Sequence, residues 1–502
     1  MTEKPPFRRI LIANRGEIAL RVIRTAREMG IETVAVYSDA DRNSLHVRRA
    51  TRAVCIGPAP PAESYLSVER ILAAAKRTCA DAIHPGYGFL SESAAFARAC
   101  AEAGIEFLGP PAEAISAMGD KVRARGIALS AGVPLVPGLE QDTDEKGLVE
   151  AARRVGFPVM LKAAAGGGGK GIRIVAREKD LLEAFRLARA EAKGAFGDDR
   201  VYLEKLVEQP RHVEIQILAD RHGNVAAYGE RECSVQRRHQ KLVEESPCAA
   251  LTPELRGEME EAARRLAKAA GYFGAGTVEF LFSKGRFYFL EMNTRLQVEH
   301  PVTEMRYGVD LVREQVRIGA GARLGPVPEP RGHAIEVRIN AEDPRTFMPS
   351  LGRIERISVP GGPGVRLDSM LYSGLVVTPH YDSMLGKLIV HAEDRARAIA
   401  RCARALQEFR IAGVSTSLPT ALAVLRDERF LAGNYDTSLI AGLGSEVEPE
   451  REELMLLAAV AARFLKAEQA GALAAERRES ASSITPAWGL LGRAERVGRR
   501  IR

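Results

Sequence analysis

Residues 276–293, GTVEFLFSKGRFYFLEMN, hold two runs of β-branched and aromatic residues on either side of a glycine-containing turn. This pattern predicts an antiparallel hairpin, in which directly opposite residues share a face. A loop with an odd number of residues would place Ser283 opposite Phe287 and, further from the turn, Glu279 opposite Glu291. An even loop would place the two glutamates on opposite faces, so the chemistry of the hairpin depends on its register.

Facing glutamates would form a candidate metal site. Like charges directly opposite each other destabilise a hairpin, so a cation is expected between Glu279 and Glu291. Their carboxylates, with Asn293 two residues after Glu291, are hard oxygen ligands that suit Mg²⁺ shared with substrate phosphates. The alternative is a pair of surface glutamates screened by lysines.

The next residues, 294–304, read TRLQVEHPVTE and contain a second candidate site. If this segment is extended, Arg295, Gln297 and Glu299 project to one side. A planar guanidinium and an amide can hold a small planar anion while the carboxylate takes its proton. A salt-bridged strand without a catalytic role is the alternative.

A glycine-rich run, GGGGKG at residues 166–171, follows a predicted strand that contains Lys162. Glycines leave backbone N–H groups free to close over phosphates, so the run predicts a mobile lid over a nucleotide. A flexible hairpin tip is the alternative. The run is not a Walker A loop, because Lys170 is followed by Gly171 rather than by Ser or Thr.

Two further segments, residues 211–216 and 233–241, bring polar and basic residues onto predicted strands. The Arg237-Arg238-His239 triplet invites an interpretation as an RNA patch. No aromatic residues interleave with it to stack on bases, so this interpretation is disfavoured.

The N-terminal residues 9–37 follow the pattern strand, turn, amphipathic helix, strand, which predicts a parallel, Rossmann-like sheet. The turn after the first strand contains only Gly16 and lacks G-x-G-x-x-G, so NAD is not expected. The glycine-rich loop at residues 84–92 follows another predicted strand. In an open parallel sheet such a loop lines the ligand crevice. A simple tight turn is the alternative.

Composition sets the broad class. The 502 residues predict roughly three to four domains at about 150 residues each. Apolar residues at 46% and charged residues at 27% exclude collagen-like, disordered and disulfide-scaffold classes. The longest uncharged apolar run, residues 454–462, is about half of a membrane span, and no signal-peptide core precedes residue 14. A cytoplasmic protein without a membrane partner is therefore expected.

Cysteine spacing and charge argue against three further kinds of site. The six cysteines form no C-x-x-C pair, so neither a zinc site nor a redox dithiol is expected. The net charge is +7, and +4 of it lies in residues 476–502. A basic tail of this kind is more typical of a solvated or interacting segment than of a reader of bases, so no nucleic-acid partner is expected.

Taken in order along the chain, these motifs resemble those of the biotin carboxylase family, the ATP-grasp component of biotin-dependent carboxylases. Each motif alone is weak, but the collinear set covers about residues 7–440 and is specific. The matching segments are residues 12–19, 84–92, 118–121, 166–171, 210–214, 236–241, 291–304, 338–343 and 381–384.

The resemblance implies an α/β fold in four parts. A Rossmann-like domain is expected at residues 7–117, and an ATP-grasp domain at 118–325 with a mobile lid at about 132–203. An α+β C-terminal domain is expected at 332–444, and a helical, basic extension at 446–502. The extension resembles the linker that leads toward a carboxyl-carrier module in longer chains.

The resemblance also implies roles for individual residues. ATP contacts are implied for Lys121, Lys162, Gly167, Gly168, Gly169, Glu204, Lys205, Val207, His212, Gln236, His239, Glu279 and Glu291, with residues 204–207 as the adenine hinge. Mg²⁺ or Mn²⁺ is implied at Glu279, Glu291 and Asn293. Bicarbonate is implied at Lys241, Arg295, Gln297 and the Val298 backbone. The biotin pocket is implied at Tyr87 and Gly88, with Arg338 as the stabiliser of the biotin enolate. Glu299 is implied as the general base, acting with Arg295, Arg338 and Lys241 as the catalytic set.

The implied activity is the ATP- and bicarbonate-dependent carboxylation of biotin through carboxyphosphate. This is the first half-reaction of an acyl-CoA or pyruvate carboxylase, as in the acetyl-CoA carboxylase of fatty acid biosynthesis. No Met-Lys-Met biotinylation site occurs in the chain, so biotin is expected on a separate carrier protein. The implied partners are that biotin carboxyl carrier protein and carboxyltransferase subunits.

A homodimer is also implied, through a helix with Arg21, Arg24 and Glu28 and a loop at residues 361–366. Pro363 departs from the aromatic residue that is common in that loop. The alternative function is another ATP-grasp ligase acting through an acyl-phosphate, which would share Lys121 and Lys162 but not the Arg338 site.

Overall fold

The computed structural model describes residues 5–139, 144–163, 172–238 and 240–443, together with Arg463 and Lys466. Residues 1–445 form one compact unit and residues 446–502 a second. The predicted glycine-rich run at 166–171 and almost all of the predicted C-terminal extension lie outside the described residues. Among the described helices, none is long and apolar enough to cross a membrane.

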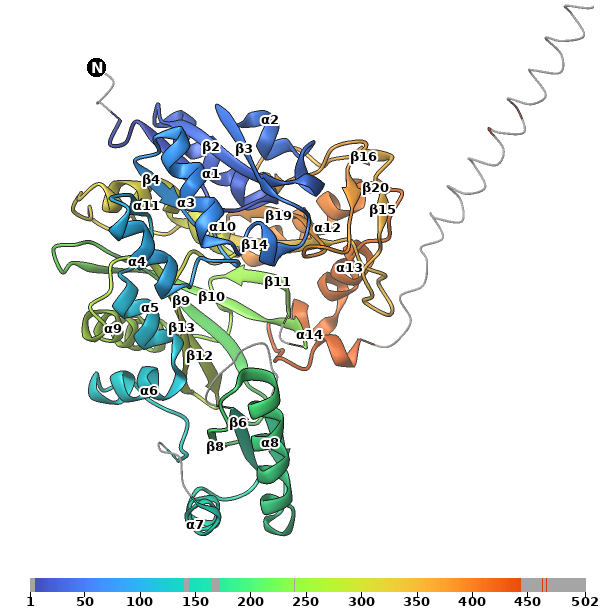
Figure 1. The fold of residues 1–502 in the computed structure, drawn as a ribbon. Coiled ribbons are helices and arrows are strands. Elements are labelled where there is room, and N and C mark those ends of the chain that lie inside the picture. The colour runs from blue at the N-terminus through green and yellow to red at the C-terminus, as the bar shows by residue number, and fades with distance from the viewer. Residues whose placement is uncertain are drawn as a thin grey trace, which may run out of the picture. The chain divides into compact units, whose positions relative to one another are not determined.

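The N-terminal part contains the predicted parallel sheet, with strand order β3-β2-β1-β4-β5 (Figure 1). The strands β1 (Arg9–Ile12), β2 (Glu32–Ser38) and β4 (Ala82–His84) are almost wholly buried because helices cover both faces, as a parallel sheet requires. The outer strands are β3 (Arg52–Gly57) and β5 (Glu106–Phe107), and the helices are α1 (Gly16–Glu28), α2 (Leu45–Arg49), α3 (Val68–Thr78) and α4 (Ala94–Glu102).

The neighbouring strands β1 and β4 end at the same edge of this sheet, where the strand order changes direction. Asn14, just after β1, donates through its Nδ2 to the carbonyls of Pro85 and Tyr87 at 2.8 Å each, which ties the two loops together. Such an edge is where open α/β sheets bind ligands. The N-terminus of α1 and Tyr87 therefore face the rest of the molecule from one edge.

The largest sheet has eight antiparallel strands in the order β13-β12-β9-β10-β11-β14-β19-β17. It is continuous from residues predicted for the ATP-grasp domain to residues predicted for the C-terminal domain. Its strands are β9 (Arg211–Ala219), β10 (Val225–Arg237), β11 (Gln240–Ser246), β12 (Gly274–Ser283), β13 (Arg286–Asn293), β14 (His333–Asn340), β17 (Val365–Ser369) and β19 (Met384–Ala392).

Helices pack on both faces of the eight-stranded sheet. On one face, α9 (Pro253–Ala269) and α6 (Lys121–Ser130) share a core with the apolar side chains of β9, β12 and β13. The remaining helices are α5 (Ala112–Gly119), α10 (His300–Tyr307), α11 (Leu311–Gly319), α12 (Arg395–Glu408), α13 (Leu418–Arg426) and α14 (Glu428–Leu431). Of these, α12 and α13 share a core with β14 and β19.

A small antiparallel sheet, in the order β7-β6-β8, lies within the predicted lid. It consists of β6 (Val159–Ala163), β7 (Ile172–Val175) and β8 (Val201–Lys205), and it packs on α7 (Glu145–Val155) and α8 (Leu181–Phe196) through its own apolar core. Figure 1 shows α8 beside β6 and β8. Two-stranded sheets pair β15 (Gly352–Arg353) with β18 (Val376–Val377) and β16 (Arg356–Ser358) with β20 (Arg410–Ala412), and single 3-10 turns occur at η1 (Asp39–Asp41), η2 (Pro61–Glu63), η3 (Glu178–Asp180) and η4 (Ile440–Gly442).

The predicted hairpin forms from β12 and β13, but its turn is even rather than odd. Ser283 pairs with Arg286, and the two turn residues Lys284 and Gly285 have φ values of 50° and 72°. Positive φ at both central positions is what a type I′ hairpin turn requires. Of the two alternatives left open by the sequence, the odd loop with Ser283 opposite Phe287 is therefore not the one that forms.

A bulge corrects the register further along the same hairpin. The register shifts between Glu279 and Phe280, so that Leu290 of β13 has no partner on β12. One extra residue on one strand changes which residues face each other beyond that point. Glu279 therefore pairs with Glu291, as predicted.

Candidate active site

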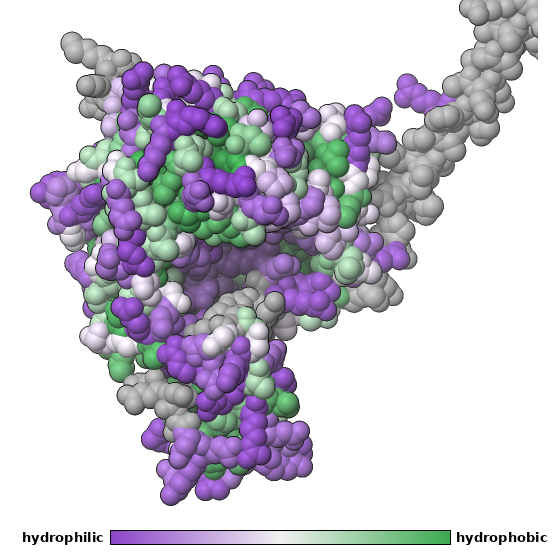
Figure 2. Space-filling view, in the orientation of Figure 1, coloured by the Kyte–Doolittle hydropathy of each residue, from purple (hydrophilic) through white to green (hydrophobic). Residues whose placement is uncertain are grey.

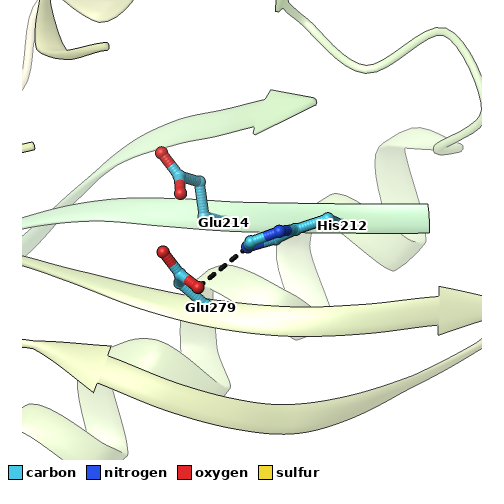
Figure 3. Close-up of side chains that lie close together, drawn as sticks. All are labelled: His212, Glu214 and Glu279. Atoms are coloured by element: carbon cyan, nitrogen blue, oxygen red, sulfur yellow. Dashed lines mark ion pairs between the residues drawn. The ribbon is translucent and has the colours of Figure 1, made fainter. Parts of the chain in front are cut away.

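Strand β9 carries an apolar face and a polar face, and both are buried. Val213, Ile215 and Ile217 belong to the core shared with α9. His212 and Glu214 alternate with them and point to the opposite face, where they meet Glu279 of the adjacent strand β12 (Figure 3). In the orientation of Figure 1, Figure 2 shows a hydrophilic hollow over the area where β10 and β11 are drawn. The polar face is therefore a floor for polar ligands rather than part of the core.

Lys241 of β11 is the centre of this polar face. Its Nζ donates to Glu299 at 2.5 Å, to Glu214 at 2.7 Å and to Glu279 at 3.2 Å. Burial opposes the charge of Lys241, but the surrounding carboxylates and Cys233 outweigh it and hold its pKa well above the ordinary value. One ammonium thus compensates acids from three different parts of the chain.

Arg231 of β10 neutralises the far side of Glu214. Its Nε donates to Glu214 Oε1 at 2.5 Å, and its other nitrogens donate to Gln216, Thr277 and Thr303. Both side chains of this ion pair are fully buried. A buried ion pair is stable only when its remaining hydrogen-bond donors also have acceptors. The remaining guanidinium nitrogens of Arg231 have such acceptors in Gln216, Thr277 and Thr303.

Glu299 lies at the N-terminus of α10 and is fully buried between two cations. Lys241 holds its Oε1, and Arg338 of β14 donates to its Oε2 at 2.9 Å. Burial opposes ionisation, but Lys241, Arg338 and Arg231 outweigh it and hold the pKa of Glu299 well below the ordinary value. The two cations therefore favour the ionised form of Glu299, and a ligand that drew either cation away would make it a stronger base.

Arg338 also contacts Glu244 of β11, where its Nε donates to Oε1 at 2.6 Å. Burial raises the pKa of Glu244 to about 7, with Arg338 opposing the rise and Glu299 adding to it. Arg338 is thus held in place by two carboxylates on neighbouring elements.

The predicted metal ligands lie together on the hairpin. Burial and the charge of Glu279 raise the pKa of Glu291, with Lys121 opposing the rise. Burial also acts against the ionisation of Glu279, but Lys241 and His212 outweigh it and hold its pKa well below the ordinary value. Two facing carboxyls, one of which resists ionisation because of its burial and the charge of the other, fit a divalent cation.

Three further side chains, those of Asn293, Gln297 and His212, surround Glu279. Asn293 and Gln297 each donate a side-chain amide to Glu279 Oε1 at 2.9 Å, and Asn293 Oδ1 accepts from Arg295 at 2.9 Å. His212 Nε2 lies 2.9 Å from Glu279 Oε2 but does not align for a hydrogen bond. In this arrangement Asn293 directs its amide nitrogen, and not its amide oxygen, toward the Glu279 carboxylate.

The segment after the hairpin is not extended, so the condition under which Arg295, Gln297 and Glu299 would project to one side is not met. Residues 294–299 form bends and a turn that lead into α10. Arg295 still donates to Gln297 at 3.1 Å and pairs with Glu92 at 2.9 Å. Glu299 is connected to Gln297 through Lys241 and Glu279 rather than through strand alternation.

Some of the predicted nucleotide contacts lie on the small lid sheet rather than on the polar face of the large sheet. Lys162 of β6 pairs with Glu204 of β8, which also pairs with Arg125 of α6. Burial lowers the pKa of Lys121, with Glu291 opposing the shift. Lys205 differs from Lys162 in its partners: its Nζ donates to the backbone carbonyls of residues 156 and 157, at 3.0 and 2.9 Å, and not to a carboxylate.

Three more predicted positions lie in other parts of the described structure. Val207, after β8, is half-buried, and Gln236 pairs with Lys241 in the β10–β11 register. Tyr87, beside Gly88, donates its hydroxyl to Glu17 of α1. Gly167, Gly168, Gly169 and His239 lie outside the described residues.

Four residues that complete the site have no role predicted from the sequence. In the sequence, Glu214 is notable only as part of a polar strand. Its alternation with His212 and Gln216 was the pattern from which a role could have been predicted. No sequence pattern pointed to Arg231, Glu244 or Arg125 as site residues, because their partners lie on other elements.

Comparisons with known proteins agree along the chain. Family models match for the biotin carboxylase N-terminal domain at residues 6–115, the carbamoyl-phosphate synthase L chain ATP-binding domain at 120–327, and the biotin carboxylase C-terminal domain at 336–442. Biotin carboxylase of Allochromatium vinosum is 54% identical over 430 residues, which cover 85% of this chain and 96% of that protein. A pyruvate carboxylase subunit from Methanothermobacter thermautotrophicus is 47% identical over 481 residues, covering 93% and 98%.

Solved structures are also similar. A biotin carboxylase–β-γ-ATP complex from Campylobacter jejuni superimposes with a TM-score of 0.85 at 48% identity, covering 87% of this chain and 98% of that chain. The biotin carboxylase domain dimer of Hydrogenobacter thermophilus 2-oxoglutarate carboxylase, in complex with MgADP, ADP and bicarbonate, gives a TM-score of 0.83 at 47% identity, covering 87% and 97%.

The role of Lys241 in charge compensation gives a stability prediction. Lys241→Met removes the cation from three buried carboxylates, so their folded-state pKa values rise above the unfolded value of about 4.3. A raised acid pKa penalises the folded state at high pH, and the penalty shrinks as the pH falls. We expect the variant to lose about 3–5 kcal/mol of unfolding free energy at pH 8 and clearly less at pH 6, measured by urea denaturation.

Lys205→Met is the matched control, because the Lys205 ammonium donates to two backbone carbonyls. Its loss of stability should be the same at pH 6 and pH 8. An equal loss at both pH values for Lys241→Met would contradict the assigned charge balance.

Proposed function

The chain belongs to the biotin carboxylase family, and from that premise we propose how its own residues carry out ATP- and bicarbonate-dependent carboxylation of biotin. It is an ATP-dependent ligase that uses ATP, Mg²⁺ and biotin on a carrier. The observation that carries the residue assignment is the position of Glu299, held between Lys241 at 2.5 Å and Arg338 at 2.9 Å. Lys241 lies beside the hairpin acids, at the half-site proposed for ATP and bicarbonate. Arg338 lies on β14, at the half-site proposed for biotin. Glu299 therefore borders both half-sites.

Glu299 is the proposed general base for bicarbonate. Bicarbonate, as an anion, competes with Glu299 for Lys241 and is also held by Arg295, Gln297 and the Val298 backbone. As Lys241 turns to the substrate, Glu299 loses a cation and becomes a stronger base, able to take the bicarbonate proton. The deprotonated oxygen then attacks the γ-phosphorus of ATP, and ADP leaves as carboxyphosphate forms.

The nucleotide is proposed to bind along the hairpin and the predicted lid. Lys121, Lys162, His212, Gln236, His239 and residues 167–169 would contact ATP, with residues 204–207 at the adenine. Glu279, Glu291 and Asn293 would hold Mg²⁺, which supplies positive charge to the phosphates of the transition state. The pairing of Glu279 with Glu291 supports this placement.

Arg338 is proposed to act on the biotin side. Carboxyphosphate releases CO₂ and phosphate, phosphate takes the proton of the biotin ureido nitrogen, and that nitrogen attacks CO₂. Negative charge develops on the ureido oxygen in this step, and a fixed guanidinium stabilises it. The contacts of Arg338 with Glu244 and Glu299 fix its position, and Tyr87 with Gly88 would line the pocket.

We further propose the four-part division at residues 7–117, 118–325, 332–444 and 446–502, which the matched segments 6–115, 120–327 and 336–442 support. The proposed partners are a biotin carboxyl carrier protein, a carboxyltransferase and a second copy of the chain. The exposure of Arg24 and Glu28 on α1 supports a homodimer, although each has a partner in its own chain at 3.7 Å, Asp368 and Arg313 respectively. Arg21 is buried and pairs with Glu304 and Asp310 of its own chain.

The activity is tested by ATP cleavage assayed with and without bicarbonate, free biotin and Mg²⁺. We expect cleavage that requires bicarbonate and is accelerated by biotin, with carboxybiotin as product. Cleavage that requires an amino acid instead would favour the alternative, another ATP-grasp ligase acting through an acyl-phosphate.

Glu299→Gln tests the base. The amide keeps the shape of the side chain but accepts no proton, so bicarbonate-dependent cleavage and biotin carboxylation should both fall about 10²–10⁴-fold. ATP affinity, measured by calorimetry, should stay at the wild-type value. Wild-type carboxylation by the variant would remove Glu299 as the base.

Arg338→Ala separates the two half-sites. Because Lys241 still holds Glu299 ionised, bicarbonate-dependent ATP cleavage should largely persist, while biotin carboxylation falls about 10²–10³-fold. Arg306→Ala is a control, since Arg306 of α10 donates to Ser246 and a backbone carbonyl and should leave both rates unchanged. Equal losses of the two activities in Arg338→Ala would contradict a biotin-side role.

A further inference from the structure

Lys387 of β19 is a fully buried lysine to which the function described above gives no role. Its Nζ donates to the backbone carbonyl of Val298 at 2.5 Å and lies 3.4 Å from Glu17 Oε1. Val298 directly precedes Glu299, so Lys387 fixes the peptide bond from which the proposed base projects. In the sheet register, Lys387 also lies opposite Arg338.

Glu17 of α1 continues this contact toward the biotin side. The oxygen that faces Lys387, Oε1, also accepts the hydroxyl of Tyr87. Glu17 Oε2 is buried without a hydrogen-bond partner. A single carboxylate oxygen therefore joins a tyrosine of the proposed biotin pocket to the lysine that holds the Val298 carbonyl.

We define the Lys387 network as Tyr87, Glu17, Lys387 and the Val298 carbonyl. Its members come from the loop after β4, from α1, from β19 and from the segment before α10. Glu17 and Lys387 are buried and Tyr87 is half-buried. The two buried side chains have few alternative positions, because leaving a donor or acceptor unpaired costs free energy. A displacement of Tyr87 is therefore passed to Val298 rather than absorbed locally.

Other acids near Lys387 do not replace Glu17. Asp368, opposite Lys387 on β17, pairs with Arg366 at 2.6 Å. Glu336 is fully buried, and neither of its oxygens has a hydrogen-bond partner. Burial raises its pKa well above the ordinary value, with Lys387 opposing the rise. Glu17 is therefore the acid that links Lys387 to Tyr87.

We propose that Lys387 and Glu17 are positioning residues that couple occupation of the biotin pocket at Tyr87 to the orientation of the Val298–Glu299 peptide. Biotin that settles against Tyr87 fixes the Lys387 network, and the network sets Glu299 for proton abstraction from bicarbonate. Neither residue touches a reacting atom. This inference rests on the proposed function, because it concerns how the two half-sites communicate.

The test compares Lys387→Met and Glu17→Leu with the conservative Glu17→Gln. The readout is the ratio of bicarbonate-dependent ATP cleavage with and without free biotin, together with the kcat of biotin carboxylation. In Lys387→Met and Glu17→Leu we expect the ratio to fall to about one and kcat to fall on the order of 10²-fold, as expected for a misplaced reacting group. ATP affinity should be unchanged.

Glu17→Gln keeps an oxygen that can accept from both Tyr87 and Lys387, so it should retain most of the acceleration by biotin. The double variant Glu17→Leu/Lys387→Met contains no unpaired buried charge at this place and should recover thermal stability lost by either single variant. It should not recover the acceleration. Glu230→Gln, which alters a buried carboxylate paired with Arg256 at 2.7 Å, is the control and should keep the wild-type ratio.

Each outcome decides one proposal. A wild-type chain without bicarbonate-dependent ATP cleavage would refute the proposed function. A wild-type chain that is active but not accelerated by biotin, or variants accelerated as strongly as the wild type, would overturn the coupling alone. Recovery of the acceleration in the double variant would also overturn it, because charge balance would then be the only role of the pair.

Discussion

The site depends on the compensation of buried carboxylates by one ammonium. Glu214, Glu279 and Glu299 approach Lys241 from two strands and a helix start, and all three acids are almost fully buried. Removing charges from water is costly unless partners replace the lost hydration. The cluster therefore holds the strands in one arrangement and favours the ionised forms of Glu279 and Glu299. An incoming anion can compete for that ammonium, which links binding to the basicity of Glu299.

The continuous eight-stranded sheet explains why several chemical tasks meet within one site. Its hairpin strands carry the proposed metal ligands, β11 carries Lys241, and β14 carries Arg338. Because β11 pairs with β14, the cation beside the hairpin acids and the cation of the proposed biotin side contact the same Glu299. The parallel N-terminal sheet adds Tyr87 and Glu17 from one edge. The arrangement thus brings the residues proposed for both half-sites together around Glu299.

Much of the fold was predictable because strand and turn patterns are local. Periodicity and glycine placement were enough to predict the parallel order of the first strands and the hairpin at residues 276–293. Glycine placement also showed that the turn after β1 carries no dinucleotide fingerprint. The pairing of Glu279 with Glu291 was predicted correctly, but for the wrong reason. The turn is even, and the bulge at Leu290 restores the register. Bulges have no reliable sequence signature, since they depend on how both strands pack.

By itself, the sequence determined the strands, the polar alternation of β9, the family, and the positions of most candidate residues. The tertiary structure decided the partners of each charge. Arg231 and Glu244 gave no signal, and Lys387 gave none either, because a Coulomb interaction depends on the distance between side chains that lie far apart in the chain. The conformation of residues 294–299 is likewise set by Lys241 and Lys387 from other strands, which is why strand alternation failed to predict it.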